Sequence, residues 1–411
     1  MLRYAAFILL SLVFGSGIKA QDISRSEYYA GMPFWESPVV PFQGEYPLTQ
    51  SEAEKRINIK FDYDTQNRIT QVSVRVGDQL KPFEGRFGNL YINAPLTKVS
   101  YGEREERHHF FDVQGHQISV LNGVFEKVYT KDRYGRNTSL TYRTEKGDAA
   151  TDQFDIQQFE WIYEEDGSIT EIRKDASGET VPLRRDFQFM RTRITYGPDG
   201  QVNMLQNIDE KGNLVNAPCG ASTLKYFYDQ YGRFKRWEVY NKDGQVAIGP
   251  SSTAGEYNVF DGIELTGIVF FNELGNPATH WSGAERWGFT HDQFGNKTSL
   301  LYLDSEGSPK LANRGYAGVQ YEWDAQGRFL NAQTYTGVDG KPMNHPSLGF
   351  ATTKYMHDEN GLLVETAYFD ASGELTNRKD NKIATVKYVY DDQGKLIATK
   401  NLNVKGKEIS L

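Results

Sequence analysis

The chain has 411 residues, a net charge of −8 and an unusual richness in aromatic residues (13%) and glycine (39 residues). Proteins that hold nucleic acid through its phosphates need a basic face, so this acidic, evenly mixed charge argues against that class of partner. Leucine-rich helical stretches are scarce, and β-branched and aromatic residues alternate with Gly, Asp and Asn. This composition favours strands joined by tight turns.

The first twenty residues have the pattern of an export signal. A short positive start at Arg3 precedes the apolar run "YAAFILLSLVF", and small residues lead up to Ala20. The apolar run is too short to anchor the chain across a bilayer. The pattern predicts a signal peptide over residues 1–20, cleavage before Gln21, and a periplasmic or secreted product with no membrane-spanning segment after signal removal.

Residues 21–56 lack any repeat and are rich in proline and aromatic residues, as in "YYAGMPFWESPVVPFQGEYPL". Terminal units of repeat proteins are often atypical caps. We therefore expect this segment to cap the first edge of a sheet, where an unpaired strand would invite pairing with other chains. The alternative is a proline-rich peptide that binds a partner. The stretch "TQSEAEKRI" is the one candidate helix.

Residues 57–411 carry a tandem repeat of about 33 residues, which we predict to be a domain of repeated β-hairpins. Counting weaker copies, the repeat occurs about eleven times. One turn glycine recurs at Gly135, Gly167, Gly200, Gly232, Gly295, Gly327, Gly361 and Gly394, with Gly262 as a degenerate copy. A companion glycine follows 11 to 13 residues later, at Gly147, Gly178, Gly212, Gly244, Gly275, Gly307, Gly340, Gly373 and Gly406.

Each repeat has the chemistry of a hairpin turn. Asp391 opens the turn and Gly394 closes it, as in a type I turn followed by a left-handed glycine. Asn67 takes the glycine position in the first copy, and Asn tolerates that geometry. Pairs such as Tyr388 and Tyr390 place two rings on one face of the strand before the turn. The fold class that follows is all-β: tandem antiparallel β-hairpins forming one elongated, coiled sheet.

The stretches "KYFYDQYGRF", "QYEWDAQGRF" and "KYVYDDQGKL" resemble the YD repeats of RHS-type exported bacterial proteins, although the period here is longer. The resemblance implies a coiling β-sheet with aromatic side chains inside, and it carries over no catalytic residue. The last repeat runs almost to Leu411, so we expect no toxin domain of the kind that RHS shells enclose.

The single cysteine, Cys219, excludes an intramolecular disulfide, and its setting "NAPCGAS" is typical of a turn rather than of a nucleophile. His108 and His109 are consecutive, so on a strand they face opposite sides and do not chelate together. His291 and His357 stand where other copies have tyrosine, which favours an aromatic role.

The acidic residues Glu160, Glu164, Glu165 and Asp166 cluster around one turn. We take them as turn and surface residues. We predict no catalytic, cofactor-binding or metal-binding residue.

The sequence therefore favours a non-catalytic exported repeat protein that acts as a binding or scaffold module at the cell envelope, with an envelope protein or a glycan as partner. The alternative is an envelope hydrolase that cleaves polysaccharide through carboxylates grafted on the sheet. If the rings of Tyr388 and Tyr390 are core, the loops 311–318 and 343–349 are left for ligands. If the rings form an open platform, they suit sugar stacking.

Overall fold

The computed structural model describes residues 23–33, 37–82, 93–183 and 187–410, so the predicted signal peptide lies outside the described residues. The described chain is all-β, as predicted, with 26 strands in one antiparallel sheet and one short helix, α1 (Gln50–Ala53). The helix begins where "TQSEAEKRI" was expected to be helical, and Thr49 and Glu52 form a reciprocal capping box at its start.

The sheet is a meander in which nearly every strand pairs with its neighbours in sequence. The strands are β1 (Arg25–Gly31), β2 (Glu45–Leu48), β3 (Ile57–Tyr63), β4 (Ile69–Val76), β5 (Gln79–Leu80), β6 (Leu96–Tyr101), β7 (Glu105–Phe111), β8 (Glu126–Lys131), β9 (Asn137–Arg143), β10 (Ala149–Ala150), β11 (Gln158–Tyr163), β12 (Ile169–Lys174), β13 (Arg191–Tyr196), β14 (Val202–Asn207), β15 (Thr223–Tyr228), β16 (Phe234–Tyr240), β17 (Gly255–Asp261), β18 (Glu264–Phe271), β19 (Arg286–His291), β20 (Lys297–Leu303), β21 (Gly318–Trp323), β22 (Leu330–Thr336), β23 (Thr352–His357), β24 (Leu363–Phe369), β25 (Thr385–Tyr390) and β26 (Leu396–Leu402).

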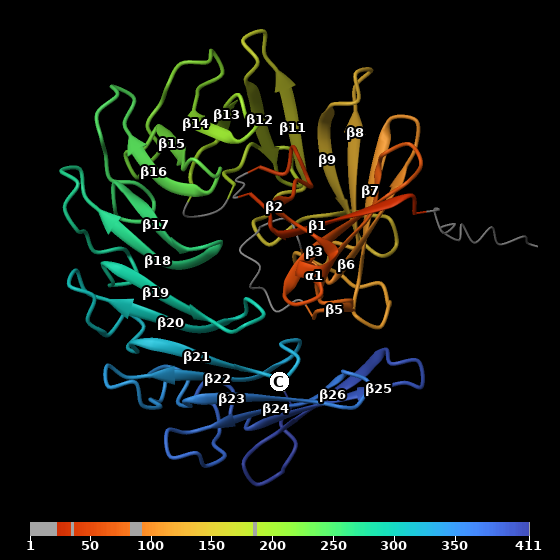
Figure 1. Ribbon diagram of the computed structural model, residues 1–411, viewed down its shortest axis with the longest axis vertical. Helices are drawn as coiled ribbons and strands as arrows, with labels where there is room; N and C mark the ends of the chain where they lie inside the picture. Colours follow the sequence, from red (N-terminus) through yellow and green to blue (C-terminus); the bar gives the residue numbers. More distant parts are fainter. Residues whose placement is uncertain (1–22, 34–36, 83–92, 184–186, 411) are drawn as a thin grey trace, which may run out of the picture.

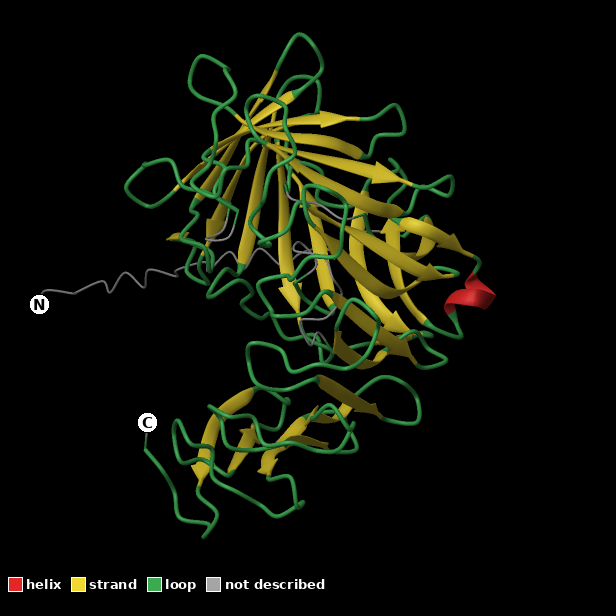
Figure 2. Cartoon of the chain, turned by 90° about the vertical axis from the view of Figure 1, so that its left-hand side faces the viewer, coloured by secondary structure: helices red, strands yellow, loops and turns green. Residues whose placement is uncertain are grey.

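Eleven hairpins make up the repeat, from β3–β4 to β25–β26, and this agrees with the number of copies counted in the sequence. Each hairpin pairs through three to five residues with the next, as β24 does with β25. Figure 1 shows the hairpins following one another around an arc, and Figure 2 shows the same strands from the side.

The predicted turn chemistry is confirmed atom by atom. At the last hairpin the Gly394 amide donates to the Asp391 carbonyl (2.9 Å), and one Asp391 carboxylate oxygen accepts from the amides of Gln393 and Lys395. Gly394 has φ +80°, and Asn67 takes the same left-handed conformation at φ +63°. The pairing register shifts just before Tyr390, which is the bulge that this turn produces.

The segment between hairpins is more ordered than a linker. The companion turn closes with Gly406 or its equivalents, and an isolated bridge such as Leu402–Glu408 joins the residues on either side of it. Most units add a third tight turn, for example from Ala312 to Gly315, which the sequence analysis missed. Cys219 lies in one of these turns, between Ala217 and Gly220, as a half-buried free thiol.

Residues 25–48, predicted as part of a cap, extend the sheet. Strand β1 pairs with β3, from Arg25 opposite Tyr63 to Tyr29 opposite Ile59, and β2 pairs with β1. Between them the chain reaches across the sheet, because the Asn137 side-chain amide donates to the Val39 carbonyl (2.9 Å).

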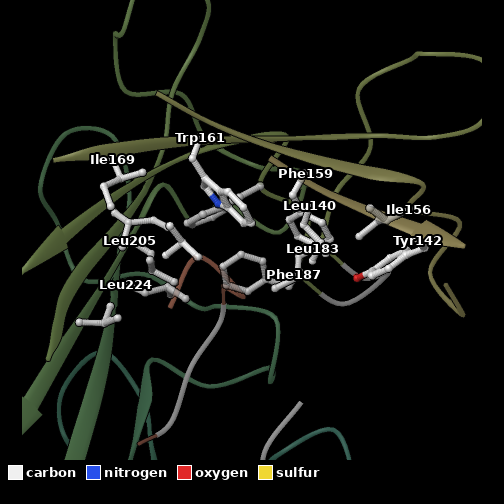
Figure 3. Close-up of a cluster of buried hydrophobic side chains, with 14 of the residues drawn as sticks. Leu140, Tyr142, Ile156, Phe159, Trp161, Ile169, Leu183, Phe187, Leu205 and Leu224 are labelled. Carbon is white, nitrogen blue, oxygen red and sulfur yellow. The ribbon is translucent and has the colours of Figure 1, made fainter. Parts of the chain in front are cut away.

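The largest core lies on the inner face of β8–β16. Its rings include Trp161 and Tyr226. Figure 3 shows Trp161 and Phe159 in this cluster together with Leu183 and Phe187. Val39 also packs into this cluster, so a distant part of the chain completes the core. Trp161 and Tyr226 are 3% and 4% exposed. The interpretation of the alternating aromatics as core therefore holds for this half of the sheet.

Candidate functional site

The aromatic residue at the end of the first strand of a hairpin makes a repeated contact with the preceding hairpin. Its side-chain donor bonds to the backbone carbonyl of the first residue of the second strand there. The five aromatic examples are Tyr101 to Ile69 (2.8 Å), Tyr163 to Asn137 (3.0 Å), Tyr228 to Val202 (2.7 Å), Trp323 to Lys297 (2.9 Å) and Tyr390 to Leu363 (2.8 Å). We call this contact the hook. It ties each of these hairpins to the preceding one at the turn end of the strands.

Two hairpins carry histidine at the hook position, His291 and His357, as the sequence alignment of the units predicted. In β17 an asparagine makes the hook instead: the Asn258 amide donates to the Phe234 carbonyl (3.0 Å). These three residues lie in the later half of the sheet, whereas in the earlier half Lys131 takes the same position at the end of β8. Each of these three residues borders a cavity.

The sheet coils so far that the turns of the later hairpins meet the N-terminal hairpin. The Ile57 amide donates to the Phe294 carbonyl (2.8 Å), and Arg56 pairs with Glu264 at 2.5 Å. Farther along, the Arg328 side chain donates to the Leu80 carbonyl (2.7 Å). We call this contact zone, between residues 30–119 and the turns of residues 229–396, the seam.

The larger cavity on the seam has a volume of about 650 Å³. Its N-terminal side comes from residues 82, 93, 95, 112–114, 118 and 119. Its other side comes from Leu330, Tyr355, His357, Gly361, Leu362, Leu363, Tyr390, Gly394 and Leu396. Aromatic and leucine side chains of three successive hairpins thus face a turn that lies more than 200 residues earlier. Periodicity along one strand cannot predict such a meeting.

The polar groups of this cavity are mostly engaged. The Asp112 carboxylate accepts from the amides of Gln114 and His116 and from the His116 ring (3.1 Å), as part of its own turn. The Tyr390 hydroxyl serves the hook. Burial lowers the pKa of His357 and keeps its ring neutral near pH 7. The cavity is therefore suited to an apolar or aromatic group rather than to acid–base chemistry.

A second cavity, of about 320 Å³, lies on the seam beside three earlier turns. It is bordered by Glu45 and Tyr46 from β2, by Asn258 and by Asn296. Burial and the nearby Asp229 carboxylate raise the pKa of Glu45 to about 7. The two cavities share Pro82, so they are neighbours along the seam.

Two clusters of charged residues are buried in the sheet, and the second of them, with Glu106 and Lys131, borders a further cavity of about 460 Å³. Arg173 and Glu171 are each about 1% exposed and pair at 2.5 Å, and the Trp161 indole donates to Glu171 (2.8 Å). Glu106 pairs with His108 (2.7 Å) and Lys131 (2.9 Å). Both sets are closed by their own partners, which is how charges are accommodated in a core.

The structure separates the two consecutive histidines as expected. His108 is buried and stacks on Phe42, whereas His109 faces Glu126 on the opposite side of β7. The acids around residue 164 behave as turn and surface residues: Glu164 accepts from Thr170, and Glu160 pairs with Lys174. Within the described ranges, no three His, Cys, Asp or Glu side chains gather as a metal site.

Tyr388 and Tyr390 are only half-buried, unlike Trp161 and Tyr226 in the earlier hairpins. Tyr390 borders the larger cavity and forms a hook at the same time. The paired tyrosines of the last hairpin therefore form neither a closed core nor an open platform, although buried clusters around Phe270 and Tyr316 persist in the preceding hairpins. No helix in the described part of the chain has the length and apolar character needed to cross a bilayer.

No protein-family model matches the chain, and no curated protein matches it by sequence. Among solved structures it is similar to a chain of TcdB2-TccC3-TEV (11% identity, TM-score 0.28, 85% of this chain and 17% of that one). It is also similar to a chain of the Tc holotoxin pore of Photorhabdus luminescens (12% identity, TM-score 0.28, 87% and 19%). A porin-like protein from Bacteroides uniformis follows (11% identity, TM-score 0.19, 68% and 88%).

The chain thus spans less than a fifth of the length of the two toxin-complex chains. At these TM-scores and identities the likeness carries no argument about family or activity. The all-β hairpin repeat rests on the strands, turns and hooks described above.

Proposed function

We propose that this chain is a non-catalytic binding module of the YD-repeat kind, exported to the cell envelope or beyond it, that holds its ligand in the larger cavity of the seam. The observation that supports this most is the cavity itself. Its volume of about 650 Å³ lies within the range of small-molecule sites, roughly 300–1,000 Å³. Export is supported by the apolar N-terminal run that ends at Ala20.

The chemistry of the wall suits one apolar or aromatic group of an envelope component, presented by a protein or by a glycan. Tyr355, Tyr390 and the leucines of β24 and β26 supply the apolar surface. Asn93 and Gln114 stand on the opposite wall, where polar groups orient a ligand. Because the two walls come from distant hairpins, a bound ligand is expected to stabilise the contact between them at the seam by mass action.

A screen of immobilised envelope proteins and glycans with residues 21–411 tests the proposal. Any ligand found is then measured with two variants. Ser119→Trp places a bulky ring at an exposed position that borders the cavity, and Gln117→Trp places the same ring two residues away, outside the lining. We expect Ser119→Trp to abolish binding while Gln117→Trp keeps it, with equal melting temperatures. Binding that survives in Ser119→Trp refutes the site.

A polysaccharide hydrolase is the second candidate, and one observation favours it. Glu45 has its pKa raised to about 7 beside the Asp229 carboxylate, as a general acid requires. However, Asp229 accepts from the amides of Tyr231 and Arg233 and from the Arg233 side chain, so it is occupied as a turn residue. The hydrolase is supported if the wild-type protein releases reducing ends from envelope polysaccharide and Glu45→Gln does not.

A further inference from the structure

The second cavity of the seam contains three buried oxygen atoms without a hydrogen-bond partner. They are Oε1 of Glu45, Oδ1 of Asn258 and Oδ1 of Asn296. Buried acceptors without a partner are uncommon in folded proteins because their lost hydration is not replaced. Three such atoms around one cavity indicate that something outside the chain supplies the donors.

The orientation of both amides is set by their other contacts. The Asn296 nitrogen donates to the Asp292 carboxylate (2.9 Å) and to the Gly327 carbonyl (2.9 Å). The Asn258 nitrogen donates to the Phe234 carbonyl in the hook. All three of these partners are acceptors, so in each asparagine the nitrogen must face them. The amide oxygen of each asparagine is therefore the atom without a partner. Asn296 is only 2% exposed, so bulk water does not solvate it.

The basic residues that border the cavity have partners within the chain: the Lys81 ammonium donates to the carbonyls of Gly327 and Arg328, and the Lys297 ammonium lies 4.2 Å from the centroid of the Phe289 ring. Glu264 pairs with Arg56, and burial together with the neighbouring Asp229 raises the pKa of Glu45, so its carboxyl is partly protonated at neutral pH. No set of three acidic or histidine ligands exists among the described residues, which disfavours a metal ion. The site thus suits a neutral ligand that brings several donors.

The cavity also has aromatic surface. Tyr46, Phe234, Phe260 and Trp323 border it. Tyr46 has φ +55°, a conformation uncommon outside glycine and asparagine, directly beside Glu45. Rings next to convergent acceptors are the combination that recognises a sugar, whose hydroxyls donate and whose C–H face lies on a ring. The volume of about 320 Å³ suits a ligand of one or two sugar units.

We propose that this cavity is a saccharide subsite in which Glu45, Asn258 and Asn296 accept hydrogen bonds from the hydroxyls of one sugar ring. The subsite is separate from the larger cavity of the proposed function, and it stands whether or not that cavity binds a ligand.

The test is calorimetric titration of the folded chain with a panel of neutral monosaccharides and disaccharides, including glucose, galactose and N-acetylglucosamine. We expect one of them to bind, and Glu45→Leu to weaken that binding at least about tenfold, because a buried hydrogen bond is lost. Glu45→Leu should also keep or raise the melting temperature, since it removes a buried carboxyl with an unpaired oxygen. A purely structural role for Glu45 predicts the opposite, a lower melting temperature.

Glu54→Leu is the matched control, because Glu54 is exposed and does not border this cavity. Ser119→Trp should leave sugar binding intact, which separates this site from the larger cavity. If Glu45→Leu does not fold, Glu45→Gln is used in its place and its crystals are soaked in the sugar. Electron density for the sugar beside Asn296 then supports the subsite. The proposal is overturned if no sugar of the panel binds, if binding is unchanged in the Glu45 variants, or if calcium or magnesium binds there instead.

Discussion

The hook at Tyr228 offers the sharpest test of how the hairpins hold together. Tyr228→Phe removes only the hydroxyl that donates to the Val202 carbonyl at 2.7 Å. Val202 is 4% exposed, so water does not readily replace the lost donor. The net loss of a hydrogen bond is about 0.5–1.5 kcal/mol, and a buried group left unpaired costs about 1–3 kcal/mol. We expect Tyr228→Phe to lower the free energy of unfolding by about 1–2 kcal/mol.

Urea unfolding, followed by tryptophan fluorescence and by circular dichroism, measures this change. Both probes are needed because long repeat arrays do not always unfold in one step. Tyr231→Phe is the control, since Tyr231 lies in the turn of the same hairpin and is 70% exposed. If Tyr228→Phe and Tyr231→Phe have the same midpoint, the hook does not contribute to stability and the argument for a repeated tie between hairpins is wrong.

Three further predictions follow from the same structure. Gly327→Val and Gly373→Val both place a β-branched residue at positive φ, which costs about 1–3 kcal/mol. Only at Gly327 would the added Cβ also meet a neighbour, the Phe294 ring at 2.3 Å. Chemical denaturation should therefore show a larger loss of stability for Gly327→Val, and equal losses in the two variants would contradict this packing. Burial raises the pKa of Glu106, but the contacts with His108 and Lys131 outweigh burial and lower this pKa to about 2, below the unfolded value of 4.5. The carboxylate therefore contributes stability above pH 4.5, and this contribution is lost as the pH falls toward 2. Glu106→Gln should reduce the fall in melting temperature between pH 4.5 and pH 2, and an unchanged fall would argue against the ion pair. N-terminal sequencing of the exported protein should find Gln21 or a near neighbour, whereas full-length protein retained in the cytoplasm would refute the signal peptide.

The hairpin repeat follows from the sequence alone. Asp391, Gly394 and their equivalents act within a few residues of one another, so local chemistry decides the turn wherever the pattern occurs. Alternation of aromatic and polar residues likewise assigned the two faces of each strand. Turn residues and alternation along a strand are local features, and a tandem repeat shows both of them in many copies.

The sequence did not reveal the hook or the third turn found in most units, and the reasons differ. The tyrosine before the turn aspartate was read only as an aromatic, because its hydrogen-bond acceptor lies about 26 residues earlier in another hairpin. The third turn varies in sequence, as "ANRG" and "APCG" show, and so has no fixed motif. The recurrence of tyrosine rather than phenylalanine before the aspartate was the available clue.

The positions of the cavities depend on long-range contacts that no local pattern in the sequence encodes. The candidate binding residues come from β2, β17 and the turn after β19, which lie up to about 250 residues apart, and they meet because the sheet coils back on its own first hairpin. The amount of coiling depends on small twists added from one strand pair to the next, and a local sequence pattern does not specify that sum. The same coiling leaves Tyr390 half-buried at the larger cavity while Trp161 is closed in the core.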